Sequence, residues 1–359
     1  MTRRNMNLLL VSPIVGLAVV AIMLGSAANT ALGADDAWSS PSAKAGGKIV
    51  LRVASAQAEE EPFKAGKAAA ESLEKAMGGV PLRAVIVSEC FEDKACKQKL
   101  LQGVCSALPK DIVLGGATYG SFSQAGCSDF DAVCLLGIGG EGVSASAGLV
   151  TNLGTAKLTF DTHQAQIEKR LRAAGAKLAG KLRRTDGDRL CILIPDAHSP
   201  KNQAIVEGVQ KVLGKAFPIT GGCVNKNAGQ TFVYYRGKMH EDAAVALLLS
   251  GDFKVSLAGR QAKEEDKVIA TARQGVAAAL AGAKGKPIAA LAFDCAGRRS
   301  KLKRMSDELA AIQKEMGKDL PLFGCYCAGE MGPVDTTDKK PGVLSGGAGW
   351  HVMFTIISQ

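Results

Sequence analysis

The sequence predicts a layered α/β fold with mixed β-sheets, built from repeated helix-strand-helix-strand units. Apolar runs of strand length alternate with amphipathic stretches of helix length. One order of elements occurs three times: helix, strand, helix, strand, glycine turn and closing strand. The central strands begin at Ala84, Cys191 and Ala289, about one hundred residues apart. Because the later strands of each copy lie close together in the sequence and are able to pair antiparallel, we expect mixed sheets.

The first copy follows a Ser/Ala/Gly-rich linker, residues 34–47, and opens with the strand-like run Ile49–Val53. Pro62 suits the first turn of the helix expected over Pro62–Met77, since proline at that position loses no helical hydrogen bond. The other elements of this copy are a strand at Ala84–Val87, a helix at Asp93–Ala107, a strand at Ile112–Leu114 before Gly115 and Gly116, and a closing strand at Ala132–Leu136.

The second and third copies repeat this order. In the second copy, an apolar stripe from Ile167 to Leu182 has helical spacing. It is followed by a strand at Cys191–Ile194, a helix at Asn202–Gly214, a strand at Pro218–Thr220 before Gly221 and Gly222, and a closing strand at Ala243–Leu249. The third copy has helices at Glu264–Leu280 and Lys301–Met316 and strands at Ala289–Phe293, Pro321–Phe323 before Gly324, and Val352–Ile357. Since glycine at a strand end permits close backbone approach, we expect the three glycine turns to meet around one ligand-binding crevice.

Residues 1–33 are expected to be an export signal. Arg3 and Arg4 precede the uncharged, mostly apolar run Leu8–Gly25, and Ala31–Gly33 fits the small-x-small pattern of a cleavage site. We therefore expect a cleaved signal peptide, of the Sec or the twin-arginine kind, and a periplasmic or extracellular protein. An uncleaved signal would instead anchor the protein in a membrane.

Charge and composition exclude some function classes. The 44 Lys and Arg against 34 Asp and Glu give a net charge of +10 over 359 residues, and no recognition motif accompanies it. Aromatic residues make up 5 %, too few for a base-stacking platform. Nucleic acid is therefore not an expected partner.

The chain contains ten cysteines and four histidines. After export to an oxidising compartment, the cysteines are able to form up to five disulfides, and they also fit the role of small buried apolar residues. No spacing typical of zinc ligands occurs, so no metal site is expected.

The run Gly137–Gly142 matches the dinucleotide-binding pattern G-x-G-x-x-G and follows a predicted strand. That pattern needs a helix N-terminus directly after it to bind the pyrophosphate. The following stretch, Val143–Leu149, is a poor helix start, so we interpret these glycines as a hairpin or loop.

The last hundred residues place a cation and a carboxylate at the ends of neighbouring predicted strands. Arg298 follows the strand at Ala289–Phe293, and Glu330 follows the strand at Pro321–Phe323. An amino-acid ligand would use such a pair, because the guanidinium binds a carboxylate bidentately and the glutamate accepts from an ammonium. The alternative is an internal Arg–Glu ion pair that joins two loops.

These residues resemble the C-terminal half of the FIST domain, a sensory domain named for F-box and intracellular signal transduction proteins. The motif is Phe293–Arg298 followed by Gly324-x-Tyr326-x-x-Gly329-Glu330-x-Gly332-Pro333. Earlier segments resemble the family's N-terminal half: Ile112–Gly120, Pro218–Gly222, Thr231–Tyr234 and Ala243–Gly251. From the resemblance we expect a FIST N-like domain over residues 48–260 and a FIST C-like domain over residues 261–359.

The resemblance implies ligand sensing, since the family binds small molecules such as amino acids and passes the signal to an output partner. Carried over by position, the candidate ligand-binding residues are Cys295, Gly297, Arg298, Gly324, Tyr326, Gly329 and Glu330, with Gly221 and Gly222 opposite them. Some members bind haem, which is the alternative cofactor here. The chain departs from the family in its export signal, in having no kinase, methyl-accepting or F-box segment, and in Cys325 and Cys327, where the family more often has aromatic residues or Thr.

We therefore expect an exported small-ligand-binding protein without catalysis, with a possible separate signalling partner. Two further alternatives stay open. Leu193–Asp196 and the helix after it fit a type I periplasmic solute-binding protein with two similar lobes. A cysteine-dependent enzyme would use Cys295 as nucleophile and Glu330 or His351 as base.

Overall fold

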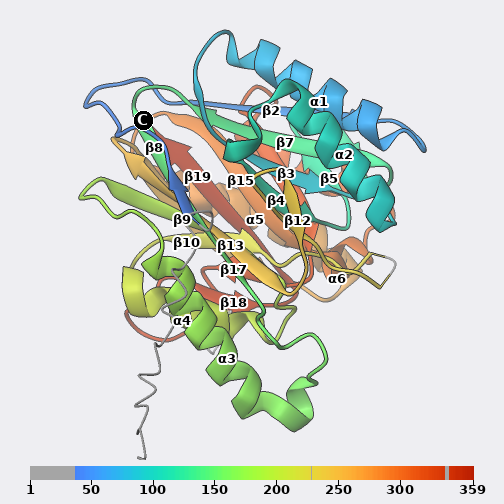
Figure 1. Cartoon of the computed structure of the whole chain (residues 1–359), viewed down its shortest axis with the longest axis vertical. Coiled ribbons are helices and arrows are strands. Elements are labelled where there is room, and N and C mark those ends of the chain that lie inside the picture. Colours follow the sequence, from blue (N-terminus) through green and yellow to red (C-terminus); the bar gives the residue numbers. More distant parts are fainter. Residues whose placement is uncertain (1–36, 228, 336–338) are drawn as a thin grey trace, which may run out of the picture. The chain divides into compact units, whose positions relative to one another are not determined.

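Three mixed β-sheets, each with a pair of helices on its outer face, make up the structure (Figure 1). The computed structural model describes residues 37–227, 229–335 and 339–359, which belong to one compact unit. The predicted α/β class with mixed sheets is confirmed. The signal peptide expected at residues 1–33 lies outside the described residues.

Each sheet is built from four strands of one sequence unit, in the same spatial order. The closing strand lies between the first strand and the central strand and pairs antiparallel with both. The central strand pairs on its other side, in parallel, with the strand that carries the glycines. In the first sheet these strands are β2 (Val50–Gln57), β7 (Ala132–Gly139), β3 (Leu82–Glu89) and β4 (Val113–Ala117), with helices α1 (Pro62–Met77) and α2 (Lys94–Ala107).

The second and third sheets repeat this order. The second has β8 (Val143–Thr151), β13 (Ala243–Gly251), β9 (Asp188–Pro195) and β10 (Ile219–Gly222), with α3 (Phe160–Gly180) and α4 (Asn202–Leu213). The third has β14 (Lys254–Gln261), β19 (His351–Ser358), β15 (Pro287–Cys295) and β16 (Leu322–Cys327), with α5 (Glu265–Ala281), the short α6 (Ala296–Arg299) and α7 (Met305–Met316).

Each glycine-bearing strand is extended by a hairpin from a different unit. Strand β4 pairs with β11 (Val233–Tyr235) of the second unit, which in turn pairs with β12 (Lys238–His240). Strand β10 pairs with β17 (Glu330–Gly332) of the third unit, which pairs with β18 (Gly346–Ala348). Strand β16 pairs with β5 (Ser121–Ser123) of the first unit, which pairs with β6 (Gly126–Ser128). The three units therefore exchange hairpins in a closed cycle.

The inner faces of the three sheets share one hydrophobic core, and each outer face packs on its own helix pair. In β3, Ile86 belongs to the shared core, whereas Val85 and Val87 pack against the helices. Burial on both faces explains why these strands are continuous apolar runs rather than alternating ones. Three sheets around one core differ from the two lobes of a type I solute-binding protein.

Glycines let the helices of two pairs approach closely. A Cβ on Gly66 of α1 would lie 2.3 Å from the carbonyl oxygen of Leu100 in α2, and one on Gly103 would lie 2.2 Å from that of Phe63. The same reciprocal contact occurs between Gly175 of α3 and Gly208 of α4. Any side chain at these positions would push the two helices apart.

Several segments differ from their prediction. Part of the expected linker forms β1 (Ala37–Ser39), which pairs antiparallel with β8. No helix follows the glycines at 137–142, as expected, but they form no hairpin, because β7 and β8 belong to different sheets. Strands β8 and β14 were not predicted. No helix among the described residues is long and apolar enough to span a bilayer.

All ten cysteines lie within the described residues and are free thiols. The structure therefore does not show the disulfides that the sequence allowed. Seven of the ten side chains are buried, in agreement with the alternative that they act as small buried apolar residues.

Candidate functional site

The strands that carry the three glycine turns converge, but not around the ligand-binding crevice that was expected. Residues Gly116–Thr118, Gly222–Val224 and the end of β16 surround one internal cavity at the centre of the three sheets. Its volume is about 10 Å³, because the side chains of Phe293, Phe323 and Cys327 fill the space. That volume is about one water molecule, so this convergence holds the fold together and has no room for an amino acid.

Arg298 lies on the opposite side of the third sheet, among α5, α6 and α7, and is fully buried. Its Nε donates to Asp294 Oδ1 at 2.7 Å, and its Nη2 donates to Glu308 Oε1 at 2.9 Å. The remaining nitrogen, Nη1, donates to Thr271 Oγ1 at 3.0 Å. Every guanidinium nitrogen is therefore bound within the protein.

The expectation that Arg298 and Glu330 form opposing halves of an amino-acid site is therefore corrected. The physical reason is β-strand alternation: Asp294 points toward the helices and recruits Arg298, whereas Glu330 and Cys295 belong to the inner side. The internal ion pair considered as the alternative exists, but its carboxylates are Asp294 and Glu308.

Tyr326 belongs to the same internal cluster. Its hydroxyl donates to Glu308 Oε2 at 2.9 Å, and only 1 % of the side chain is exposed. Burial raises the pKa of Glu308 well above its usual value, and Asp294 adds to this shift, while Arg298 opposes it. Two carboxyl groups that share one cation in a dry interior favour a state in which one proton stays bound.

Cys295 and Glu330 do lie together, on the inner side of β15 and β17. Burial raises the pKa of Glu330 well above its usual value, and the backbone N–H of His351 and the thiol of Cys295 oppose the shift only in part. Burial likewise raises the pKa of Cys295 to about 12, with a further contribution from Glu330. The backbone N–H of Trp350 donates to the Cys295 sulfur at 3.3 Å.

The candidate glycines are packing positions. Gly221 and Gly222 pair directly with Met331 and Glu330, so they do lie opposite the C-terminal motif. A Cβ on Gly324 would lie 2.2 Å from the ring of Phe122, and one on Gly297 would lie 3.1 Å from the ring of Trp350. Gly329 has a φ of 136° and lies against Ser199.

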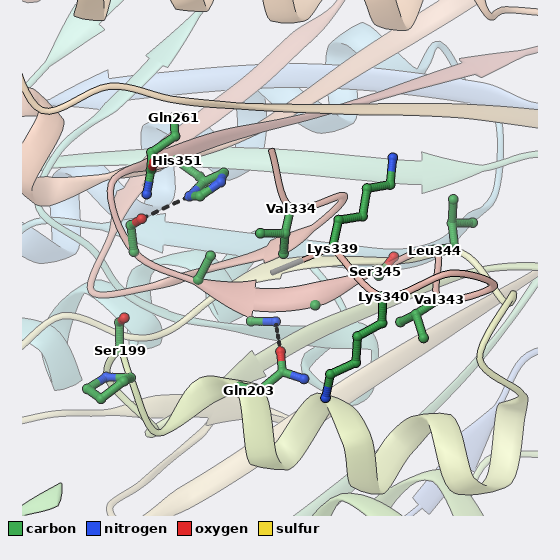
Figure 2. Close-up of a pocket in the computed structure, with 15 residues that line it drawn as sticks. Ser199, Gln203, Gln261, Val334, Lys339, Lys340, Val343, Leu344, Ser345 and His351 are labelled. Atoms are coloured by element: carbon green, nitrogen blue, oxygen red, sulfur yellow. Dashed lines mark hydrogen bonds between the residues drawn. The ribbon is translucent and has the colours of Figure 1, made fainter. Parts of the chain in front are cut away.

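An open cleft of about 620 Å³ lies beside β18 (Figure 2). It is bounded by the start of α4, by β18 with the loop before it, by the C-terminal end of β14 and by the N-terminal end of β19. Seven polar side chains line the cleft: Ser199, Gln203, Gln261, Lys339, Lys340, Ser345 and His351. Of these, only His351 was considered as a functional residue from the sequence.

Three of these polar groups have no partner within the described part of the protein. The hydroxyl of Ser199, the amide of Gln261 and the ammonium of Lys339 make no hydrogen bond or ion pair there. Gln203 is engaged, because its Oε1 accepts from the backbone N–H of Gly347 at 2.8 Å. The cleft thus presents a hydroxyl, an amide and a cation to a small polar molecule.

His351 has both ring nitrogens engaged. Nδ1 lies 2.8 Å from the carbonyl oxygen of Gly349 and so donates to it, while Nε2 accepts from the backbone N–H of Asp335 at 3.2 Å. Burial lowers the pKa of His351. The imidazole is therefore neutral and fixed in one tautomer at neutral pH.

Comparison with known proteins identifies the family. The model of the FIST N domain matches residues 83–275, and the model of the FIST C domain matches residues 237–333. No curated protein is significantly similar to the chain in sequence.

Among solved structures, the cyanuric acid hydrolase of A. caulinodans matches with a TM-score of 0.42 and 12 % identity, over 87 % of this chain and 100 % of that one. A second cyanuric acid hydrolase matches with a TM-score of 0.42 and 9 % identity, over 87 % and 99 %. The two domain models together span most of the three units described above, and the chain belongs to the FIST family.

Proposed function

We propose that this protein is a small-ligand-binding sensory protein without catalysis, and that its ligand binds in the cleft beside β18. The observation that carries the proposal is the cleft itself: about 620 Å³, formed by segments of the second and third units, with three polar side chains that have no partner in the described structure. FIST domains bind small ligands, and the central cavity is too small for one.

An amino acid is the proposed ligand class. Lys339 supplies a cation for a carboxylate, and the Gln261 amide and the Ser199 hydroxyl supply neutral hydrogen bonds. Haem is not proposed, because His351, the histidine in the cleft, has no free ring nitrogen to offer an iron.

The chemistry of Cys295 supports a role without catalysis. The nucleophile of a cysteine-dependent enzyme is the thiolate, and a thiol with a pKa of about 12 is protonated at neutral pH. Burial raises the pKa of Glu330 and so disfavours the carboxylate that would act as its base, and His351 has no free nitrogen. No activated nucleophile results from these three residues.

Export remains part of the proposal and rests on the sequence of residues 1–33. Export predicts a mature chain that begins at Ala34 and is found outside the cytoplasm. N-terminal sequencing of the protein from fractionated cells tests this. A chain that starts at Met1 in the cytoplasmic fraction would contradict it.

Ligand binding is tested by native mass spectrometry of the purified protein, followed by thermal shift with each of the twenty L-amino acids. We expect at least one of them to bind and Gln261→Ala to weaken that binding about five-fold, the effect of one neutral hydrogen bond. Gln102→Ala, an exposed glutamine on α2, is the matched control and is expected to have no effect. Failure of all twenty to bind would overturn the proposal.

A further inference from the structure

Four carboxylic side chains in the described part of the chain are fully buried, with at most 1 % of their surface exposed: Glu89, Asp294, Glu308 and Glu330. Three of them have a cation beside them. Glu89 lies 3.0 Å from Lys97 Nζ, and Asp294 and Glu308 lie 2.7 and 2.9 Å from Arg298 nitrogens. Glu330 forms no ion pair among the described residues, although the charge of Arg298 partly opposes the rise of its pKa. A buried carboxyl without an ion pair is the exception in this protein.

One oxygen of Glu330 also has no hydrogen-bond donor. Oε2 accepts from the backbone N–H of His351 at 3.1 Å, whereas Oε1 is buried and has no partner in the described structure. A buried acceptor without a donor is costly, by about 1–3 kcal/mol in general. By contrast, Glu89 binds the hydroxyl of Tyr234 and the backbone N–H of Phe91 in addition to Lys97.

Glu330 lies directly behind the wall of the cleft. It pairs with Ala348 across the β17–β18 ladder and is bonded to the backbone of His351, and both of these residues line the cleft. Gly349 and Trp350 connect the two. Trp350 has a φ of 62°, the left-handed region that a bulky side chain rarely adopts. This turn is the segment that would have to shift for a molecule in the cleft to reach the Glu330 carboxyl.

We propose that Glu330 is the subsite for the primary ammonium group of the ligand, reached from the cleft when the Gly349–Trp350 turn moves aside. This inference rests on the cleft as the ligand site. An ammonium offers a positive charge and three N–H donors, so it would supply an ion-pair partner for Glu330 and a donor to its Oε1. The ligand's carboxylate then faces Lys339 at the open side of the cleft.

Binding in this subsite changes the protonation of Glu330. In the free protein the groups around its carboxyl are Cys295 and Asp294 of β15, Arg298 of α6, Cys327 of β16, His351 of β19 and Cys223 after β10. Burial favours the neutral acid there. When an ammonium arrives with its own three protons, the acid becomes a carboxylate and its single proton passes to the solvent. Ligand binding therefore releases protons, up to one for each ligand bound.

The experiment compares the amino acid that binds best among the twenty with its 2-hydroxy acid, in which a hydroxyl replaces the ammonium. Calorimetry in phosphate and in Tris, buffers that differ in ionisation enthalpy, gives the number of protons released. We expect the wild type to bind the amino acid at least about tenfold more tightly than the hydroxy acid, and to release a measurable fraction of a proton, up to one, for each ligand bound.

Glu330→Gln is expected to lose both the preference and the proton release, while Glu141→Gln, an exposed glutamate paired with Lys44, keeps them. Equal affinity for the two molecules, or no proton release from the wild type, overturns the ammonium subsite and leaves the ligand cleft standing. Failure of every amino acid to bind overturns both proposals. The wild-type measurements decide the question even if Glu330→Gln does not fold.

Discussion

Gly222 lies directly opposite Glu330 in the antiparallel ladder between β10 and β17. This pair joins the glycine turn of the second unit to the C-terminal motif of the third. A Cβ on Gly222 would lie 2.2 Å from the Cys327 sulfur, so no larger residue fits there without a shift of β16 or β10. The motif residues thus fix the position of β17, and β17 in turn forms the wall behind the ligand cleft.

Arg298→Ala is expected to destabilise the protein by about 3–5 kcal/mol, because it leaves Asp294 and Glu308 buried without a cation. Urea denaturation measures this. Arg304→Ala removes an exposed ion pair with Asp307 and is expected to change stability by no more than about 1 kcal/mol. If Arg298→Ala were as mild as Arg304→Ala and instead abolished ligand binding, Arg298 would be a ligand-binding residue after all.

Gly324→Ala is expected to cost about 1–3 kcal/mol by overpacking, since its Cβ would enter the ring of Phe122. In a Phe122→Ala background the added methyl group occupies space that the ring has left. In that background Gly324→Ala should be neutral or stabilising, which a double-mutant cycle measured by urea denaturation would show. Gly180→Ala is the control, because a Cβ there meets no atom within 4 Å. Independent, additive effects at 324 and 122 would contradict the contact.

Glu330→Gln is expected to remove a pH dependence of stability. A glutamate in the unfolded chain ionises near about pH 4.3, and burial raises the pKa of Glu330 in the folded protein. The folded state therefore binds the proton more tightly, so the stabilisation is complete below the unfolded pKa and is lost as pH rises toward the folded one.

The unfolding free energy of the wild type relative to Glu330→Gln should therefore fall as the pH rises above about 4, by at most about 1.4 kcal/mol per pH unit. Urea titrations of both proteins at several pH values, without ligand, give this difference. A difference that rises with pH would mean that Glu330 is ionised in the folded protein.

The cysteines are expected to react with N-ethylmaleimide in two groups. Cys96, Cys105 and Cys127 are half-buried and should be modified first in the native protein, while the seven buried thiols react only after unfolding. In guanidinium without reductant, all ten should be modified. Mass spectrometry counts the adducts, and a parallel sample with reductant is the control. Fewer than ten adducts in the sample without reductant would establish disulfides.

Much of the fold was predictable, because long amphipathic and apolar runs carry their own periodicity. The helix expected over Pro62–Met77 has those bounds in the structure, and the strands at Cys191–Ile194 and Ala289–Phe293 are the centres of longer strands. Strand β14 was missed because it is only half-buried and mixes apolar with polar residues. The exchanged hairpins have strands of three residues, too short to show a period.

The candidate site was predictable only in part. The motif identified the family and included both Cys295 and Glu330, but it could not show that they lie together or on which face of its strand each side chain lies. Asp294 was therefore overlooked as the partner of Arg298. The cleft residues Ser199, Gln261 and Lys339 are far apart in the sequence and belong to no motif. Only the hairpin exchange, which seats β18 against α4, brings them together.

The cyclic exchange of hairpins also dictates when the chain is able to fold during synthesis. The first sheet has its helices and four strands once β7 is made, yet its edge stays open until β11 and β12 emerge, about one hundred residues later. The second sheet is incomplete until β18 has been synthesised, and the third is incomplete until its closing strand β19, which ends at Ser358, has been synthesised. No sheet of this protein is complete until most of the chain has left the ribosome, so the open edges of β4 and β10 must be kept from pairing with other chains in the meantime.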